Sequence, residues 1–332
     1  MIPESNNAAV VRALRKAFDV AEFEDIRMLT AGLSSALVFR IVVRGRPYLL
    51  RVITRTDEMS DPTRQFACMR SAAEAGLAPR IWYASVEDRL SITDFVEARP
   101  FPLAEALVRL PVALRALHAL PPIPMPKLGN YLDLMDGFIK KFQSAGILPN
   151  SETEEHFQAY ARVRSVYPRL DSEMVSCHND LKPENILFDG DRVWLVDWEA
   201  AFLNDRYADL AVVANFIVTN DAEEAAYLRN YFGEAASEYQ LARFYLMRQI
   251  LHMSYASVFL LIASSGKPVA PDANVPDFRE FHNRTWTGEI SLATDEAKLQ
   301  YGRVHLNQLL QNARAPRFQR SLQIVSDRHA SA

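Results

Sequence analysis

The chain has 332 residues, of which 37 are basic and 41 acidic, so its net charge is −4 with the histidines neutral. A hydrophobic fraction of 49% and a charged fraction of 23% are typical of globular proteins, and they exclude a mainly disordered, collagenous or coiled-coil chain. The slight acidity argues against a protein that chiefly binds a nucleic-acid backbone.

Cysteine content and hydropathy predict a cytoplasmic protein that does not associate with membranes. Cys68 and Cys177 are too few for a disulfide framework and fit a reducing compartment. The polar residues 1–7 lack the basic and apolar parts of a secretory signal. The most apolar stretch, residues 253–263, is shorter than the about 20 residues that span a bilayer, so we expect a buried helix.

The first part of the chain, residues 1–97, predicts a small antiparallel sheet with packed helices. Gly45 marks the turn of a hairpin, while Asp61, Pro62 and Gly76 mark the ends of a helix. Helices are expected at 7–18 and 62–75, and strands at 26–30, 37–43, 48–53, 80–84 and 90–95.

The remainder, residues 98–332, is mainly helical in pattern and begins with a hinge at 98–100. The helical period breaks between residues 175 and 196, where strands at 186–188 and 193–196 flank an Asp-Gly turn. Helices are expected at 103–119, 131–144, 153–167, 207–219, 222–232, 238–263 and 295–311.

Ionisable residues gather around this short hairpin. Asp180 and Asp197 flank it and Asn185 lies at its start, so their side chains can reach one cleft. A buried carboxylate is costly unless it is paired or holds a metal, and carboxylate and amide oxygens suit Mg²⁺ rather than Zn²⁺. The spacing Asp-x-x-x-x-Asn followed by an Asp at a strand end is the layout that holds Mg·ATP.

Other chemistry fits these residues less well. A zinc site on His178 lacks a second His or Cys at ligand spacing. Cys177 and His178 are neighbours in extended chain and point to opposite faces, so they do not form a nucleophile pair. A turn of solvated acids would not explain why the matched positions coincide with a strand–turn–strand pattern.

The motif His178–Asp180 with Asn185, followed by Asp197-Trp198-Glu199, resembles the choline/ethanolamine kinase and aminoglycoside phosphotransferase superfamily. The later motifs at 204–205 and 209–211 resemble its choline-kinase-like bacterial branch. The resemblance implies transfer of the γ-phosphoryl group of ATP to an alcohol hydroxyl, with Mg²⁺ as the cofactor. Expected partners are ATP and a small hydroxylated, cationic acceptor, and a homodimer is left open.

The resemblance also implies an α+β, bilobal protein-kinase-like fold. Residues 1–97 would form the nucleotide-binding lobe, and residues 98–332 the helical catalytic and acceptor-binding lobe. His178 and Asp209 would brace the catalytic loop rather than take part in the chemistry.

The family pattern implies a role for each residue around the hairpin. Asp180 is the base, or it orients the acceptor hydroxyl, and Asn185 and Asp197 bind Mg²⁺. Glu199 supports a second metal or faces the acceptor. Lys182 either neutralises the migrating phosphoryl group or is a solvated loop lysine.

In the amino-terminal lobe the resemblance implies a nucleotide site. Arg51 is the strand cation for the α- and β-phosphates. Ser34 and Ser35 lie in the turn that would cover the phosphates together with backbone amides. Asp94 and Val96 lie where the hinge would present backbone groups to adenine.

One position departs from the family pattern. The helix at 62–75 normally carries a Glu that pairs with the strand cation, but this slot holds Gln65, which cannot neutralise Arg51. Glu74 or Glu58 would have to compensate, or phosphate binding is less tightly organised. This departure keeps open a nucleotide-binding pseudokinase or scaffold.

Three features argue against phosphorylation of a protein substrate. Asn179 replaces the Arg that reads an activation-loop phosphate, and Asp197-Trp198-Glu199 replaces Asp-Phe-Gly. Only about ten residues separate Asp197 from the next predicted helix, too few for an activation segment. A small-molecule acceptor is therefore favoured.

The acceptor pocket is expected near Glu199 in the helical lobe. A quaternary ammonium would bind in an aromatic cage, for which Tyr255, Phe281 and Trp286 are candidates. Ordinary core packing is the alternative role for each of them. An aminoglycoside would need more acidic residues than this region supplies. Choline or a related amino alcohol is the first hypothesis, and an aminoglycoside or another hydroxylated metabolite the second. Residues 268–283 would be a substrate lid or a plain loop.

Overall fold

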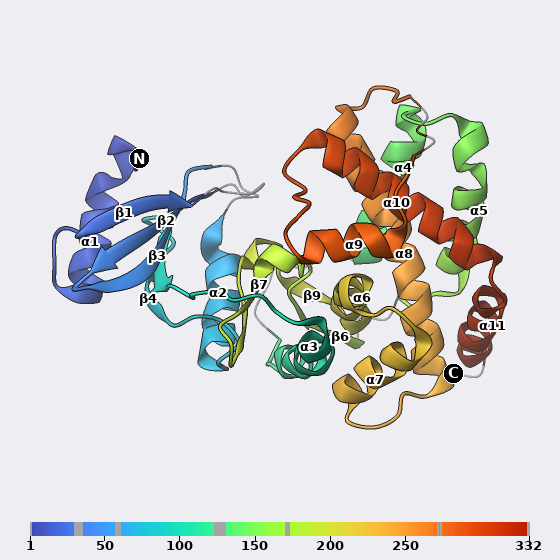
Figure 1. Cartoon of the computed structure of the whole chain (residues 1–332), viewed down its shortest axis with the longest axis horizontal. Coiled ribbons are helices and arrows are strands. Elements are labelled where there is room, and N and C mark those ends of the chain that lie inside the picture. The colour runs from blue at the N-terminus through green and yellow to red at the C-terminus, as the bar shows by residue number, and fades with distance from the viewer. Residues whose placement is uncertain are drawn as a thin grey trace.

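The computed structural model describes residues 2–29, 36–56, 61–122, 131–169, 173–270, 272 and 274–330. These residues form two lobes, with a sheet in the amino-terminal lobe and mainly helices in the larger one (Figure 1). The predicted α+β, bilobal architecture is confirmed.

The amino-terminal lobe is a five-stranded antiparallel sheet with the order β1-β2-β3-β5-β4. Helix α1 (Asn7–Phe18) packs against it, burying Ala13 and Leu14 on the same core as Phe39 and Leu50. The strands are β1 (Asp25–Leu29), β2 (Ala36–Val43), β3 (Arg46–Ile53), β4 (Ile81–Ser85) and β5 (Leu90–Asp94).

The β2–β3 hairpin fixes the register of the central strand. Its turn residues Arg44 and Gly45 have φ values of 51° and 72°, the backbone that a tight two-residue hairpin requires. The register places Arg51 opposite Val38 on one side and Ser91 on the other. Arg51 therefore lies on a strand with neighbours on both sides and is buried.

Helix α2 (Pro62–Glu74) lies between the sheet and the helical lobe (Figure 1). Asp61 caps its start by accepting a hydrogen bond from the Thr63 amide at 2.7 Å. Its buried Phe66 and Met69 belong to the same hydrophobic core as the helices of the larger lobe. The helix is thus anchored on the carboxy-terminal lobe, although it belongs to the amino-terminal part of the sequence.

The larger lobe is built around α8 (Glu238–Ser264), which packs against α4, α5, α6, α10 and α11. By length and composition α8 could span a membrane, but most of its apolar window is buried inside the lobe. The other helices are α3 (Leu103–His118), α4 (Tyr131–Ala145), α5 (Asn150–Val166), α6 (Arg206–Ile217), α7 (Asp221–Phe232), α9 (Phe278–Trp286), α10 (Asp295–Arg314) and α11 (Pro316–Ala330).

Two pairs of short strands frame the functional region. The predicted hairpin is present as β7 (Ile186–Phe188) and β8 (Val193–Leu195). The sequence did not predict β6 (Met174–Cys177) and β9 (Phe202–Asp205), because strands of four residues that pair over a long sequence distance show no clear period.

Two helices also escaped prediction, α9 and α11. The segment 268–283, left open as a lid or a loop, contains the start of α9. The side chain of Asp277 caps this helix by accepting hydrogen bonds from the Arg279 and Glu280 amides. This cap is the sequence signal that was available.

A test of the helix packing uses Gly302 on α10, where a Cβ would lie 2.7 Å from Leu260 Cγ on α8. We expect Gly302→Ala to lower the free energy of unfolding by about 1–3 kcal/mol through overpacking. The matched control is Gly137→Ala on α4, where a Cβ would meet no atom within 4 Å and should stabilise by up to about 1 kcal/mol. Urea unfolding measures both, and stabilisation by both would contradict the close approach.

Candidate active site

The loop between β6 and β7 brings the first two predicted site residues together. Asn185 Nδ2 donates to the main-chain oxygen of Asp180 at 2.7 Å and to Asp180 Oδ2 at 2.9 Å. Lys182 Nζ lies 3.1 Å from the same Oδ2. Both Asn185 and Lys182 therefore hold the Asp180 carboxylate from the loop itself.

Asp197 follows β8 and faces the same region. The Val196 amide donates to the Asn185 carbonyl at 3.0 Å, which fixes the end of β8 beside the loop that carries Asp180. Asp197 itself has φ 66° and ψ 69°, a left-handed backbone that is uncommon for a residue with a side chain. Such strain persists only where the surrounding structure imposes it, and it is concentrated at functional sites.

The donor set fits a divalent cation. The buried Oδ1 of Asp197 accepts no hydrogen bond from any residue that the structure describes, and the nearest cationic atom is Arg51 Nη2 at 3.0 Å. Asn185 turns its Nδ2 to Asp180, and none of the described residues donates to its Oδ1. A carboxylate oxygen and an amide oxygen are the hard ligands that Mg²⁺ binds.

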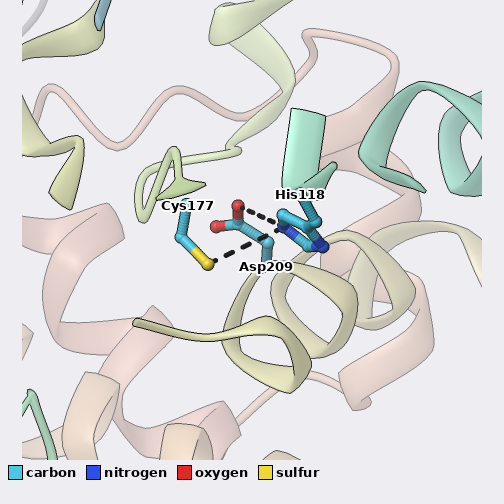
Figure 2. A group of neighbouring side chains, drawn as sticks. All are labelled: His118, Cys177 and Asp209. Atoms are coloured by element: carbon cyan, nitrogen blue, oxygen red, sulfur yellow. Dashed lines mark hydrogen bonds and ion pairs between the residues drawn. The ribbon is translucent and has the colours of Figure 1, made fainter. Parts of the chain in front are cut away.

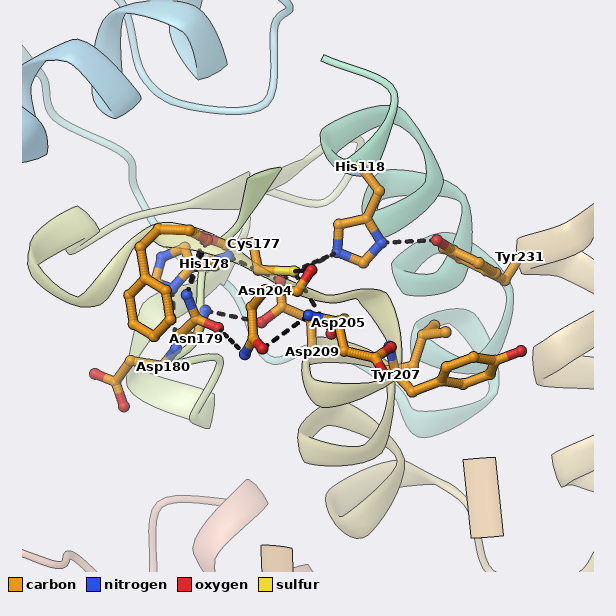
Figure 3. A network of polar contacts seen from close by, with 12 residues as sticks. His118, Cys177, His178, Asn179, Asp180, Asn204, Asp205, Tyr207, Asp209 and Tyr231 are labelled. Carbon is orange, nitrogen blue, oxygen red and sulfur yellow. Dashed lines mark hydrogen bonds and ion pairs between the residues drawn. The ribbon is translucent and has the colours of Figure 1, made fainter. Parts of the chain in front are cut away.

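Asp209 at the start of α6 holds the loop in place. Its two carboxylate oxygens accept hydrogen bonds from the backbone amides of His178 and Asn179, each at 2.8 Å. Figure 3 shows this network, from which the Asp180 carboxylate points away. The His178 ring in turn lies 2.9 Å from the Val196 carbonyl. The bracing roles predicted for His178 and Asp209 are confirmed.

Asn179 is a positioning residue whose role the sequence did not reveal. It has φ 63°, which Asn tolerates better than most residues. Its Nδ2 donates to the carbonyls of Ala200 and Phe202 at 3.1 and 3.2 Å. Asn204 on β9 donates to its Oδ1 at 2.6 Å. These bonds fasten the residue before Asp180 to the neighbouring strand.

His118, Cys177 and Asp209 form a buried cluster whose ligand atoms lie within 4.8 Å of one another (Figure 2). The cluster fits a hydrogen-bonded brace better than a metal site, because Asp209 already accepts two backbone amides. His118 Nδ1 lies 2.8 Å from the Tyr231 hydroxyl. Burial raises the pKa of the Cys177 thiol well above its usual value, so the thiolate that a metal requires is disfavoured.

Arg51 of β3 forms ion pairs with residues of the carboxy-terminal lobe. Its guanidinium pairs with Glu199 and lies 3.0 Å from Asp197 Oδ1. The strand cation is thus placed beside the predicted metal ligands. The metal and acceptor roles of Glu199 stay predictions, since its carboxylate faces Arg51.

Of the other residues that were predicted to bind the nucleotide, the structure describes Asp94 and Val96. Asp94 ends β5, where its carboxylate accepts a hydrogen bond from Trp82 Nε1 at 2.7 Å. Val96 follows in the segment that connects the lobes. Ser34 and Ser35 lie outside the described residues.

The three aromatic residues predicted to form a cage for the acceptor lie in different surroundings. Phe281 is fully buried in the hydrophobic core, which is ordinary packing. Trp286 donates its ring N–H to the Phe101 carbonyl at 3.0 Å, beside the segment that connects the lobes. Tyr255 is half-buried and packs near Tyr301 of α10, with ring centroids 6.1 Å apart.

Tyr301 is an aromatic residue that the sequence did not single out. Burial raises the pKa of Tyr301, and the charges of Asp180 and Glu184 raise it further. Tyr255 and Phe259 pack on the Tyr301 ring, with ring centroids 6.1 and 4.8 Å apart, so the three rings form one aromatic cluster.

The electrostatics of the loop favour a proton acceptor. Burial raises the pKa of Asp180, and the charge of Asp197 adds to the rise, while Lys182 opposes it. Burial lowers the pKa of Lys182, but its pairing with Asp180 outweighs burial and the net shift is upward. A carboxylate with a raised pKa is a better base than a solvated one, and Lys182 stays charged beside it.

Comparison with known proteins agrees with this geometry. The model of the phosphotransferase enzyme family matches residues 25–245. Ethanolamine kinase 2 of Mus musculus is 32% identical over 174 residues, which cover 46% of this chain and 44% of that protein. The chain matches less than half the length of its curated relatives.

Solved structures share the whole fold. A choline/ethanolamine kinase family protein from Mesorhizobium loti superposes with a TM-score of 0.68 at 20% identity, covering 97% of this chain and 99% of that one. A spectinomycin phosphotransferase, solved with ADP and spectinomycin, gives a TM-score of 0.56 at 12% identity and covers 90% and 98%. At these identities the likeness establishes the fold.

The brace on the catalytic loop can be tested with Asp209→Asn. We expect a loss of about 3 kcal/mol in the free energy of unfolding, because the amide nitrogen would face a backbone N–H in a buried site. Denaturant unfolding measures the change. Asp221→Asn is the control, since the Asp221 side chain is 95% exposed and its pairing with Arg317 should contribute at most about 1 kcal/mol. Equal losses would mean that Asp209 does not brace the loop.

Proposed function

The chain belongs to the phosphotransferase enzyme family, and from this we propose that it moves the γ-phosphoryl group of Mg·ATP to the hydroxyl of choline or a related amino alcohol. The observation that carries the proposal is the meeting of Asp180, Asn185 and Asp197 around one short hairpin, opposite Arg51. This arrangement would supply a base, two hard metal ligands and a phosphate-binding cation between the lobes.

Each side chain has a distinct task in the proposed reaction. Asn185 and Asp197 would hold Mg²⁺, which when bound neutralises charge on the phosphates. Asp180 orients the acceptor hydroxyl and takes its proton, and Lys182 holds that carboxylate in place. Arg51 binds the α- and β-phosphates, since a guanidinium can pair with two phosphate oxygens at once.

The proposal extends to the organisation of the chain. Residues 1–97 bind the nucleotide, with Ser34 and Ser35 over the phosphates and the backbone of Asp94 and Val96 at adenine. Residues 98–332 carry the catalytic loop and bind the acceptor. A cytoplasmic location is supported by the two buried free thiols, Cys68 and Cys177.

An amino alcohol is supported by the aromatic cluster of Tyr255, Phe259 and Tyr301 in the helical lobe. Cation–π contacts contribute about 0.5–2 kcal/mol each, and they suit a quaternary ammonium better than a polyhydroxylated ligand. Tyr255 supplies one face of the proposed site, and Trp286 is the second acceptor residue that we propose, whereas the Glu199 carboxylate faces Arg51. The similarity to ethanolamine kinase 2 and to a choline/ethanolamine kinase family protein points to the same class.

The second candidate is an aminoglycoside or another hydroxylated metabolite. The fold shared with a spectinomycin phosphotransferase supports it. A nucleotide-binding scaffold without turnover is the alternative of another class. The pairing of Asp180 with Asn185 argues against the scaffold, because binding alone does not need a hydroxyl-orienting carboxylate.

The function is tested by ADP release with choline, ethanolamine and an aminoglycoside panel. We expect release that depends on choline or ethanolamine, and a loss of at least about 100-fold in Asp180→Ala, which removes the proton acceptor. In Asp197→Ala the activity should fall similarly while the free energy of unfolding changes by less than about 2 kcal/mol. Release that depends only on an aminoglycoside favours the second candidate, and ATP binding without any acceptor-dependent release favours a scaffold.

The pH dependence provides a separate test through Lys182→Gln. The charge of Lys182 lowers the pKa of Asp180 against the effect of burial, so its removal should raise that pKa further. Because the base must be deprotonated, the acid limb of the kcat/KM profile should move to higher pH. Lys182→Arg keeps the charge and should leave the limb near its original position. An unchanged limb in Lys182→Gln would show that Asp180 is not the titrating base.

A further inference from the structure

The helix position that would pair with the strand cation carries no acid. Gln65 on α2 is only 6% exposed. Among the residues that the structure describes, no hydrogen bond or ion pair joins it to Arg51. Glu74, the described alternative from the sequence, is exposed at the end of α2 and makes no ion pair with Arg51. Glu58 lies outside the described residues.

A carboxylate from the other lobe faces Arg51 instead. Glu199 belongs to the one-turn helix η5 (Trp198–Ala200), directly after Asp197. Its Oε1 accepts a hydrogen bond from Arg51 Nη2, the same nitrogen that lies 3.0 Å from Asp197 Oδ1. The Arg51 side chain is 11% exposed, so its charge requires a nearby partner.

The turn that carries Glu199 is held at each of its three residues. Trp198 is buried, and its ring N–H donates to the Leu195 carbonyl at 3.2 Å. Arg64 of α2 donates to the Glu199 main-chain oxygen at 2.6 Å. Asn179 donates to the Ala200 carbonyl at 3.1 Å. The Glu199 carboxylate therefore projects from a fixed backbone, as a helix residue would.

We propose that Glu199 is the positioning residue for Arg51, in place of an acid at the Gln65 position of α2. This inference rests on the proposed function, because it concerns the cation that would bind the ATP phosphates. One guanidinium contacts two carboxylates here. Glu199 would orient Arg51 toward the phosphates also when Asp197 binds a divalent ion. The ion pair between Arg51 and Glu199 would then join the two lobes directly, without an acid on α2.

A double-mutant cycle on Arg51 and Glu199 tests this role. We expect Glu199→Gln to lower kcat/KM for ATP about tenfold in the unmodified protein, but less than about twofold in the Arg51→Gln background, because its effect passes through Arg51. The dissociation constant of a nonhydrolysable ATP analogue, measured in the same four proteins, should show the same non-additivity. Glu74→Gln makes the same charge change on α2 and should alter neither quantity.

The metal is monitored separately. Mn²⁺ affinity in the complex with the ATP analogue, followed by electron paramagnetic resonance, should fall in Asp197→Asn but stay within about twofold in Glu199→Gln. A Glu199→Gln effect of equal size in both Arg51 backgrounds, or a loss of Mn²⁺ affinity like that of Asp197→Asn, would overturn the proposal and favour a metal-ligand role.

The two proposals fail in different ways. An unmodified protein without acceptor-dependent ADP release would contradict the proposed function, yet the cycle on analogue binding would still decide the role of Glu199. Conversely, a working enzyme with additive mutations would contradict only the positioning role.

Discussion

The geometry of the site depends on one buried carboxylate that binds two consecutive backbone amides. Asp209 fixes His178 and Asn179, and the residue that follows them is Asp180. A carboxylate in a dry environment is stable only when its oxygens are satisfied, so the loop and Asp209 stabilise each other. The Asp180 side chain, to which we assign the role of base, would then act from a backbone that is already ordered, which is electrostatic preorganisation.

The second constraint is the placement of charge between the lobes. A sheet residue, Arg51, meets carboxylates that follow β8, and Arg64 of α2 binds the backbone of the same turn. These ion pairs are close together because one residue separates Asp197 from Glu199 and the chain turns there, in η5. The two carboxylates are close because they are close in the sequence, whereas Arg51 reaches them through a tertiary contact from the other lobe. The site therefore contains residues of both lobes.

The sequence predicted the hairpin motif and most of the helices, but it did not predict the contacts that Arg51 and Asn179 make with distant residues. The motif at Asp180, Asn185 and Asp197 could be located because its spacing around a hairpin is dictated by local backbone geometry, and the long amphipathic helices show a clear period. The partner of Arg51 could not be found, because Glu199 reaches it through tertiary contact. The anchoring of Asn179 was missed for the same reason, since its partners lie on the unpredicted strand β9.

The attachment of α2 divides the amino-terminal part of the sequence between two hydrophobic cores. Phe66 and Met69 of α2 are buried in the core of the larger lobe, whereas Leu14 of α1 and Phe39 and Leu50 of the sheet are buried in a separate core. Residues 1–97 alone would therefore leave the apolar side of α2 without the partners that the helical lobe supplies, so this part of the sequence is not a self-contained folding unit.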